Sequence, residues 1–163
     1  MPNMSKETLD NDQFHFIDEV ASLLIPWGMP PAAARLYGYL LLSKGAVSLD
    51  QIAIDLEVSK SSASVAARLL EQCMLIRRHG ERGSKRALYG ATENYAGLFN
   101  ERSLLLGALG NLLQSRVDEV ATGEAAKRLQ DMSSLYLSMQ EAMNSTVRKH
   151  AKRKHVKKVA NDK

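Results

Sequence analysis

Apolar side chains return every three or four residues through the first part of the chain, as they do on one face of a helix. This spacing predicts a helix over residues 11–25 and a second helix over residues 31–43. Between them, Gly28 suits a helix C-terminal cap, and Pro30 and Pro31 suit the first turn of the next helix. The chain therefore opens with two helices joined by a short break.

Two further helices are predicted where serine stands at an expected N-cap position. Ser48, with Gln51 three residues later, has the spacing of a capping box and begins a short third helix. A tight turn then leads to Ser59, a good N-cap for a fourth helix over residues 60–72. A short helix, a tight turn and a capped second helix together make a helix-turn-helix.

A β-hairpin is predicted directly after the fourth helix. Residues 74–79 and 86–92 are typical of strands, and residues 80–85 between them form a loop with two glycines. A hairpin in this position is the wing of a winged helix-turn-helix. We therefore expect a mainly α fold, with a three-helix core, a β-hairpin wing, and flanking N- and C-terminal helices.

The remaining chain is predicted to be helical, with apolar stripes along two long helices. The first of these begins near residues 93–98 and ends before Thr122 and Gly123. Its stripe consists of Leu106, Leu109, Leu113, Val117 and Val120. The stripe of the last helix has spacings of four and three, as in coiled coils, and consists of Ala125, Leu129, Met132, Tyr136, Met139 and Met143.

The apolar stripes are longer than a small winged helix can bury, and long exposed stripes are unfavourable. We therefore expect a homodimer, with an intramolecular three-helix packing as the alternative. On this hypothesis, residues 1–29 and 93–147 form dimerisation helices, residues 30–92 form a DNA-binding domain, and residues 148–163 form a basic tail. The tail either extends the last helix or is disordered.

The net charge of +4, from 22 basic and 18 acidic residues, is concentrated in two segments. Residues 148–163 hold eight basic residues and one acidic residue, for a net charge of +7. Residues 59–90 hold seven basic and two acidic residues, for +5, which leaves −8 for the rest of the chain. Clustered like charges repel one another, and an anionic partner offsets that cost. For residues 148–163, the alternative to an anionic partner is a chain end that is simply exposed to solvent.

The inner basic segment coincides with the two elements that a winged helix presents to DNA. The fourth helix is sized for the major groove, and a wing arginine can enter the minor groove. The residues expected to contact DNA are Ser59, Lys60, Ser61, Ser62, Ser64, Arg68, Arg82, Lys85 and Arg86. Serine hydroxyls suit phosphates or base edges, and the cations supply charge.

The segment from residue 25 to residue 92 resembles a known family of regulators. The matching residues are Trp27-Gly28-Met29-Pro30 and residues 34–43, 49–53, 58–64, 68–70 and 75–77. They resemble the winged helix of MarR-type transcriptional regulators and, more narrowly, the GbsR-like branch, which includes choline-sensing repressors of glycine betaine synthesis genes. The resemblance implies a homodimeric, DNA-binding repressor whose terminal helices form the interface. Two-fold symmetry then implies a pseudo-palindromic operator with half-sites ~34–36 Å apart.

The resemblance covers less than half of the chain and departs from the family at two turns. Glu57 stands where many helix-turn-helix units carry glycine, and Met74 stands where glycine usually precedes the first wing strand. A residue other than glycine adopts a left-handed turn at some energetic cost. We expect the fold to be kept at both turns.

Aromatic residues are concentrated near the N-terminus, where five of the nine lie between Phe14 and Tyr39. Quaternary ammonium ligands bind in aromatic cages through cation–π attraction. The candidates for such an effector pocket, between the dimerisation helices and the winged helix, are Phe14, Trp27, Tyr37 and Tyr39. The alternative is that these rings pack in the core and the interface.

Other classes of site find little support in the sequence. Paired carboxylates, a nucleophile–base set and a phosphate-binding loop are absent, and the four histidines lack metal-ligand spacing. We therefore expect neither an enzyme nor a cofactor. Cys73 is the single cysteine, either a small buried residue or a redox-sensing thiol. No signal or membrane-spanning pattern is visible, which favours a cytoplasmic protein without a membrane partner.

Two rival functions stay open. A winged-helix adaptor would bind protein and show no salt-dependent binding to DNA. A non-specific DNA- or RNA-binding protein led by the basic tail would bind without sequence preference.

Overall fold

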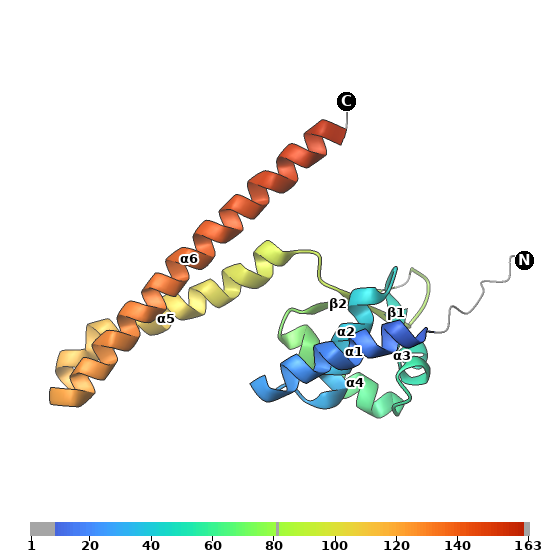
Figure 1. Cartoon of the computed structure of the whole chain (residues 1–163), viewed down its shortest axis with the longest axis horizontal. Coiled ribbons are helices and arrows are strands. Elements are labelled where there is room, and N and C mark those ends of the chain that lie inside the picture. Colours follow the sequence, from blue (N-terminus) through green and yellow to red (C-terminus); the bar gives the residue numbers. More distant parts are fainter. Residues whose placement is uncertain (1–8, 81, 162–163) are drawn as a thin grey trace, which may run out of the picture. The chain divides into compact units, whose positions relative to one another are not determined.

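The computed structural model describes the backbone of residues 9–80 and 82–161, and the side chains of the same range up to residue 153. The described residues form two compact units that divide between Glu93 and Asn94. Figure 1 shows the first unit as a group of short helices with a small sheet, and the second as two long helices. Residues 1–8 of the expected N-terminal dimerisation segment lie outside the described residues, and its role stays a prediction.

The first unit follows the predicted order of a winged helix-turn-helix. Its elements are α1 (Asn11–Leu24), a 3-10 turn (Ile25–Trp27), α2 (Pro31–Leu42), β1 (Val47–Ser48), α3 (Leu49–Asp55), α4 (Lys60–Gln72), β2 (Ile76–Gly80) and β3 (Ala87–Ala91). The strands pair antiparallel in the order β1-β3-β2. The expected fold class is confirmed, and β1 is too short for its strand character to show in the sequence.

The hydrophobic core of this unit lies where its helices meet the sheet. The largest fully buried side chains are Ile17, Leu36, Leu40, Ile52, Leu70 and Ile76. The buried side of α4 consists mainly of small residues, Ala63, Ala66 and Ala67, together with Leu70. Because this side of α4 is covered, the opposite side of the same helix faces outward.

Caps predicted from the sequence hold the helix ends. Ser59 Oγ accepts a hydrogen bond at 3.0 Å from a backbone N–H in the first turn of α4. Gly28 ends the 3-10 turn with φ of 91°, a conformation that favours glycine. The capping box expected at α3 is half formed: Ser48 Oγ accepts the N–H of Gln51 at 3.2 Å, but the Gln51 amide donates to Asp55 instead.

The wing strands are shorter than predicted. β2 begins at Ile76 instead of residue 74, because Met74 adopts a left-handed backbone with φ of 59° and belongs to the turn after α4. The strand predicted over residues 86–92 loses one residue at each end. The N–H of Thr92 still donates to the carbonyl of Leu75 at 3.0 Å, which closes the base of the hairpin.

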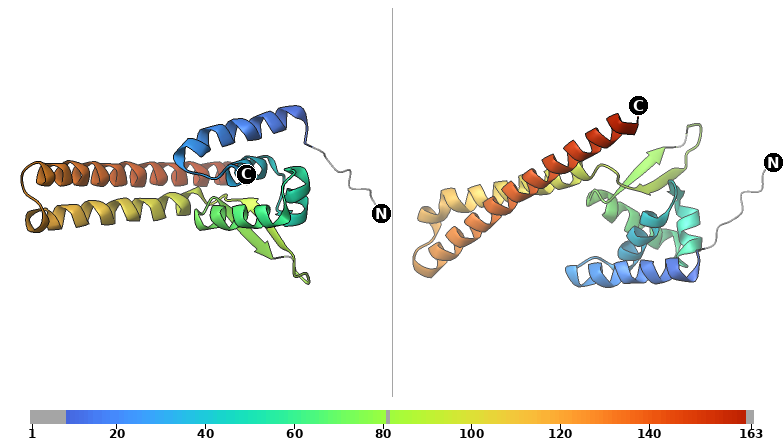
Figure 2. Two further views of the ribbon diagram at one scale, coloured as in Figure 1. Left: turned by 90° about the horizontal axis from the view of Figure 1, so that it is seen from below. Right: turned by 45° about the horizontal axis from the view of Figure 1, so that its top comes forward.

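The second unit is a hairpin of two long helices, α5 (Tyr95–Val120) and α6 (Gly123–Asn161). Figure 2 shows the two helices side by side in both views. α6 continues past Arg148, so the described part of the basic tail extends the last helix, one of the two predicted alternatives. Residues 162–163 lie outside the described residues.

The two long helices meet along small residues. Gly107 and Gly110 of α5 are buried, and a Cβ on Gly110 would come within 2.7 Å of a leucine side chain of α6. Ser133 Oγ donates to the carbonyl of Gly110 at 2.8 Å, and Ser103 Oγ donates to Asn144 Oδ1 at 2.5 Å. Small residues and hydroxyl groups therefore allow the close approach of α5 and α6.

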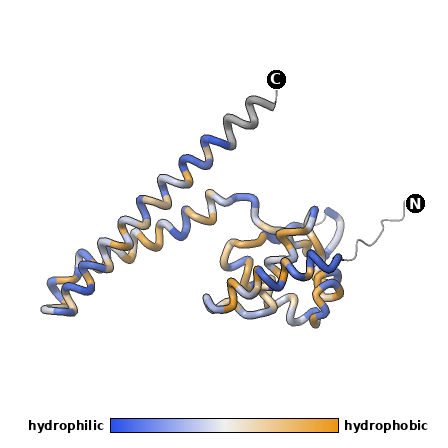
Figure 3. The backbone as a smooth tube through the Cα atoms, in the orientation of Figure 1, coloured by the Kyte–Doolittle hydropathy of each residue, from blue (hydrophilic) through white to orange (hydrophobic). Residues whose placement is uncertain are grey.

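Because small residues form this contact, several leucines of α5 point away from α6. Leu105, Leu109 and Leu112 have spacings of four and three, share one side of α5, and are exposed. The residues of the apolar stripe predicted for α5 do not share one environment, since Val117 is buried whereas Val120 is exposed. Figure 3 shows hydrophobic positions distributed along both helices. The second unit thus leaves apolar surface uncovered within a single chain.

Replacing Glu57 with glycine is expected to stabilise the first unit. Glu57 is exposed and holds φ of 55° between α3 and α4, a conformation that costs an L-residue about 1–2 kcal/mol. Glycine removes this strain but loses more backbone entropy on folding, so Glu57→Gly should raise the free energy of unfolding by about 0.5–1 kcal/mol. Urea unfolding measures the change. Glu57→Ala keeps the Cβ atom, and equal stability of the Gly and Ala variants would contradict the strain.

Candidate nucleic-acid interface

The outward side of α4 carries four exposed residues in one line, which we call the free face of α4: Ser61, Val65, Arg68 and Gln72. Their spacings of four, three and four positions keep them on one side of the helix. Ser61 and Arg68 are among the predicted DNA contacts. Val65 and Gln72 are not, although the same helical spacing, counted from Ser61, indicates them.

Two of the other predicted serines, Ser59 and Ser62, take part in the start of α4. Ser59 Oγ is the N-cap acceptor and donates to Ser62 Oγ at 2.9 Å. Ser62 is exposed, whereas Ser64 is half-buried. The hydroxyls of Ser59 and Ser62 therefore meet at the N-terminus of α4, which they stabilise.

Lys60, at the start of α4, forms an ion pair with Asp50 of α3. Its Nζ lies 2.8 Å from Asp50 Oδ1, and both side chains are largely exposed. The hydrogen bond and the charge of Lys60 lower the pKa of Asp50, and the charge of Arg86 acts in the same direction. Asp50 therefore lies within electrostatic reach of both α4 and the wing. Sequence reasoning missed it, because the pair forms only when α3 and α4 fold together.

The tip of the wing presents its predicted cations to solvent. Arg82, Lys85 and Arg86 are all exposed. Ser84 Oγ accepts the backbone N–H of Arg86 at 3.0 Å, which orders the return of the loop toward β3. Glu81, in the same loop, lies outside the described residues.

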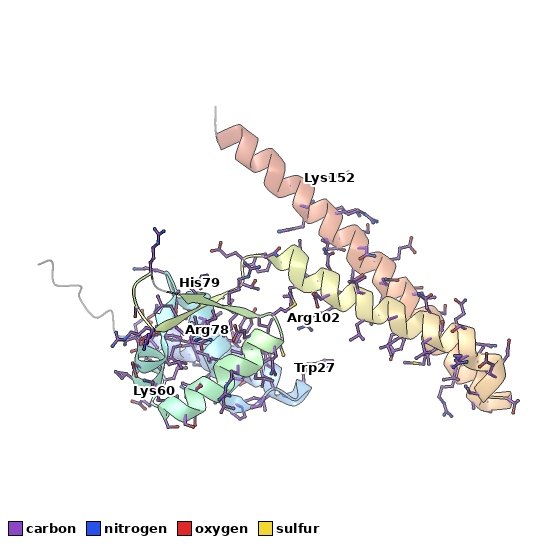
Figure 4. The ribbon with its side chains drawn as sticks, turned by 180° about the vertical axis from the view of Figure 1, so that it is seen from behind. Trp27, Lys60, Arg78, His79, Arg102 and Lys152 are labelled. Atoms are coloured by element: carbon purple, nitrogen blue, oxygen red, sulfur yellow. The ribbon has the colours of Figure 1, made fainter. Side chains whose placement is uncertain are left out.

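β2 adds two arginines that belong to the inner basic segment but were not among the expected DNA contacts. Arg77 and Arg78 are exposed, and so is His79. Successive residues of a strand point to opposite faces, so Arg77 and His79 share one face of the wing and Arg78 takes the other. Figure 4 shows Arg78 and His79 on β2 and Lys60 at the start of α4. The first unit thus joins a polar helix face to a cationic hairpin.

The aromatic residues predicted for an effector pocket are dispersed over this unit. Trp27 is 90% exposed at the end of the 3-10 turn, where Figure 4 labels it. Tyr37 and Tyr39 are two positions apart on α2, so their side chains leave the helix about 200° apart. Phe14 is half-buried on α1. The single chain does not bring the four rings together, and an effector pocket stays a prediction.

Tyr39 has a structural role instead. Its hydroxyl donates to Asp55 Oδ2 at 2.7 Å, and Gln51 Nε2 donates to Asp55 Oδ1 at 2.6 Å. Burial, followed by the hydrogen bond to Asp55, raises the pKa of Tyr39 well above its usual range. The phenol therefore remains a donor, and it ties α3 to α2 beneath the helix-turn-helix.

An apolar cavity of about 410 Å³ lies in the second unit, between the start of α5 and the later part of α6. Tyr95 and Phe99 line it from α5, and Met143, Val147 and His150 line it from α6. The rings of Tyr95 and His150 meet edge to face, with centroids 6.4 Å apart. The volume falls in the range of small-molecule sites. The sequence gives no sign of this cavity, because it depends on how α5 and α6 pair.

The described residues show neither a metal site nor a membrane-spanning helix. Among them, no group of three or more His, Cys, Asp or Glu side chains is placed to hold a metal ion. Within the same residues, no helix combines the length and apolar character needed to cross a bilayer. Cys73 is half-buried as the C-cap of α4, and a redox role for it stays untested.

Comparisons with known proteins find one similar fold and one weakly similar sequence. No protein-family model matches the chain. A solved crystal structure of a transcriptional regulator has a TM-score of 0.76 at 23% sequence identity, covering 86% of this chain and 99% of that chain. The chain is 21% identical over 136 residues to YvaV of Bacillus subtilis (strain 168), which is named as an HTH-type transcriptional regulator. The matched residues cover 76% of this chain and 77% of YvaV.

MepR, a transcription regulator of the Staphylococcus aureus multidrug efflux pump MepA, overlaps less well. Its crystal structure has a TM-score of 0.39 at 15% identity, covering 91% of each chain. The comparison that bears on the fold is therefore the one with a TM-score of 0.76, and this chain shares its fold with that solved transcriptional regulator.

The pKa of Asp50 provides a direct test of its contact with Lys60. A nuclear magnetic resonance titration should place this pKa below the ordinary aspartate range, because the ionised carboxylate pairs with Lys60. The stabilisation from the pair is present above the ordinary pKa and is lost as the pH falls through the lowered one. Lys60→Met should return the pKa of Asp50 toward the ordinary range.

Lys85→Met is the matched control, since it removes the same charge from the wing and leaves the 2.8 Å contact between Lys60 and Asp50 in place. The pKa of Asp50 should stay lowered in this variant. An Asp50 pKa that is the same in the wild type and in Lys60→Met would show that the ion pair does not form in solution.

Proposed function

We propose that the chain is a sequence-specific DNA-binding transcriptional regulator, a MarR-type homodimeric repressor of the GbsR-like branch. The observation that carries the proposal is the free face of α4, which is polar and cationic apart from Val65, on the same compact unit as a wing with exposed cations. An outward-facing helix with short side chains can enter the major groove, and a wing arginine can reach the minor groove. The likeness to a solved transcriptional regulator supports the same function.

Four of the exposed cations of the first unit have an assigned contact in this proposal. Arg68, on the free face, suits the O6 and N7 atoms of a guanine. Lys60 contacts a phosphate, which then competes with Asp50 for the same ammonium group. Arg82 and Lys85, at the tip of the wing, contact the backbone or the minor groove beside the major-groove site.

Dimerisation follows from apolar surface that a single chain leaves exposed. Leu105, Leu109 and Leu112 form a line on α5, away from α6, and Leu105 is 61% exposed. Leu23 and Trp27 are exposed at the end of α1 and beyond it. Burial of such surface in a second copy is favourable. The resulting two-fold symmetry calls for a pseudo-palindromic operator with half-sites ~34–36 Å apart.

A small-molecule effector would act by favouring one arrangement of the dimer over another. An effector that binds preferentially to a dimer whose half-site spacing does not fit the operator increases the population of that form, and the dimer then leaves the DNA. Two places are candidates for the effector: the aromatic residues near the N-terminus, completed by the second chain, and the cavity between α5 and α6. Repression itself would follow from occlusion of a promoter by the bound dimer.

The operator for this test is a DNA site selected from random sequences with the wild-type protein. Arg82→Ala is expected to weaken binding to this site roughly tenfold, as the loss of one well-placed arginine does. It should also reduce the slope of log affinity against log salt by about one. Fluorescence anisotropy across a salt series measures both quantities. Arg102→Ala is the control, since Arg102 is an exposed arginine of α5 outside the winged helix. The affinity of this variant for the operator should match that of the wild type.

The same series separates the rival functions. Equal losses in the two variants would contradict the assignment of the wing. A folded dimer without salt-dependent DNA binding would favour the protein adaptor, and binding without sequence preference would favour the tail-led binder.

The double variant Leu105→Gln, Leu112→Gln is expected to shift the protein from dimer to monomer, because it replaces two exposed leucines of one line with polar side chains. Light scattering after gel filtration gives the mass. Leu104→Gln is the control: Leu104 is also exposed but lies off this line, so its variant should remain dimeric. A wild-type monomer, or an unchanged dimer in the double variant, would rule out this interface.

A further inference from the structure

Val65 is an exposed apolar residue within the free face of α4. Its side chain is 59% exposed, with Ser61 before it and Arg68 after it along the same line of the helix. A shallow groove beside it, lined in part by Pro30 and Leu69, leaves most of the side chain uncovered. On a face that meets a partner, such a side chain gains from any apolar group that covers it.

In the major groove of DNA, one chemical group can provide that cover. The base edges there are hydrogen-bond donors and acceptors, except for the C5 methyl group of thymine. Valine offers two methyl groups, and in a helix its β-branched side chain is held mainly in one rotamer. Val65 therefore presents a rigid apolar contact that suits the methyl group of thymine better than the edge of any other base.

We propose that Val65 is a specificity-determining residue that contacts the methyl group of a thymine in each half-site. The inference rests on the proposed DNA-binding function and extends it by assigning a base preference to an apolar side chain. Arg68, three residues later on the same face, suits a guanine. Three helical residues span about 4.5 Å and base pairs are about 3.4 Å apart, so the thymine and the guanine lie one or two base pairs from each other.

Uracil provides the sharpest test, because it differs from thymine only by the missing methyl group. Binding sites are first selected from random DNA with the wild-type protein. Each thymine of one half-site is then replaced in turn by deoxyuridine. At one of these positions the replacement should weaken wild-type binding about fourfold, the factor for burial of one methyl group. Val65→Ala should bind the thymine and uracil forms of that duplex with equal affinity.

Ile54→Ala is the matched control. Ile54 is 60% exposed and apolar, but it lies on α3 and outside the free face of α4. Its variant should keep the fourfold loss at the same thymine. Thermal unfolding checks that Val65→Ala remains folded, as expected for the truncation of an exposed side chain.

The outcomes separate the inference from the function on which it rests. If Val65→Ala keeps the loss on uracil, or if no thymine of the selected site responds, the inference is overturned while sequence-specific binding stands. If the wild-type protein selects no sequence from random DNA, the proposed function is overturned and the inference with it.

Discussion

Burial of one side of α4 is the constraint on which the rest of the first unit depends. Three alanines and Leu70 hold this side in the core, and Ser59 fixes the start of the helix. Together they set the rotation of α4 about its own axis, so the free face must point to solvent. The hydrogen bond from Tyr39 of α2 to Asp55 of α3 then holds α3 on α2, and Gln51, within α3, donates to the other oxygen of the same carboxylate. The exposure of the proposed DNA-binding face thus follows from packing on the opposite side of one helix.

The second unit is governed by a different packing rule. Gly107 and Gly110 let α5 approach α6 closely, and Ser103 and Ser133 satisfy their hydroxyl groups across the contact. Where these small residues face α6, the leucines Leu105, Leu109 and Leu112 lie on the outer side of α5. The same choice of small residues that pairs the two helices therefore leaves an apolar line available to a second copy of the chain.

Local signals predict most of the fold, because caps and turns act over a few residues. Ser59 caps α4 as its position indicates, and Met74 takes the left-handed conformation expected where the MarR-type regulators that the chain resembles carry glycine. Contacts between distant residues are not predictable in this way: Lys60 meets Asp50 only once α3 and α4 have folded together. Val65 is hard to place from hydropathy, which favours the core, whereas its position on α4 exposes it. Much of the candidate site follows from the sequence, and the pairing within it requires the structure.

If the free face of α4 enters the major groove, it shields guanine N7 atoms there. Dimethyl sulfate methylates guanine N7 in the major groove and adenine N3 in the minor groove, so protection from methylation distinguishes the two sides of the duplex. On DNA selected by the wild-type protein, guanine N7 should be protected in each half-site, and Arg68→Ala should lose that protection. Protection confined to adenine N3, or guanine N7 protection that persists in Arg68→Ala, would contradict the placement of α4 in the major groove.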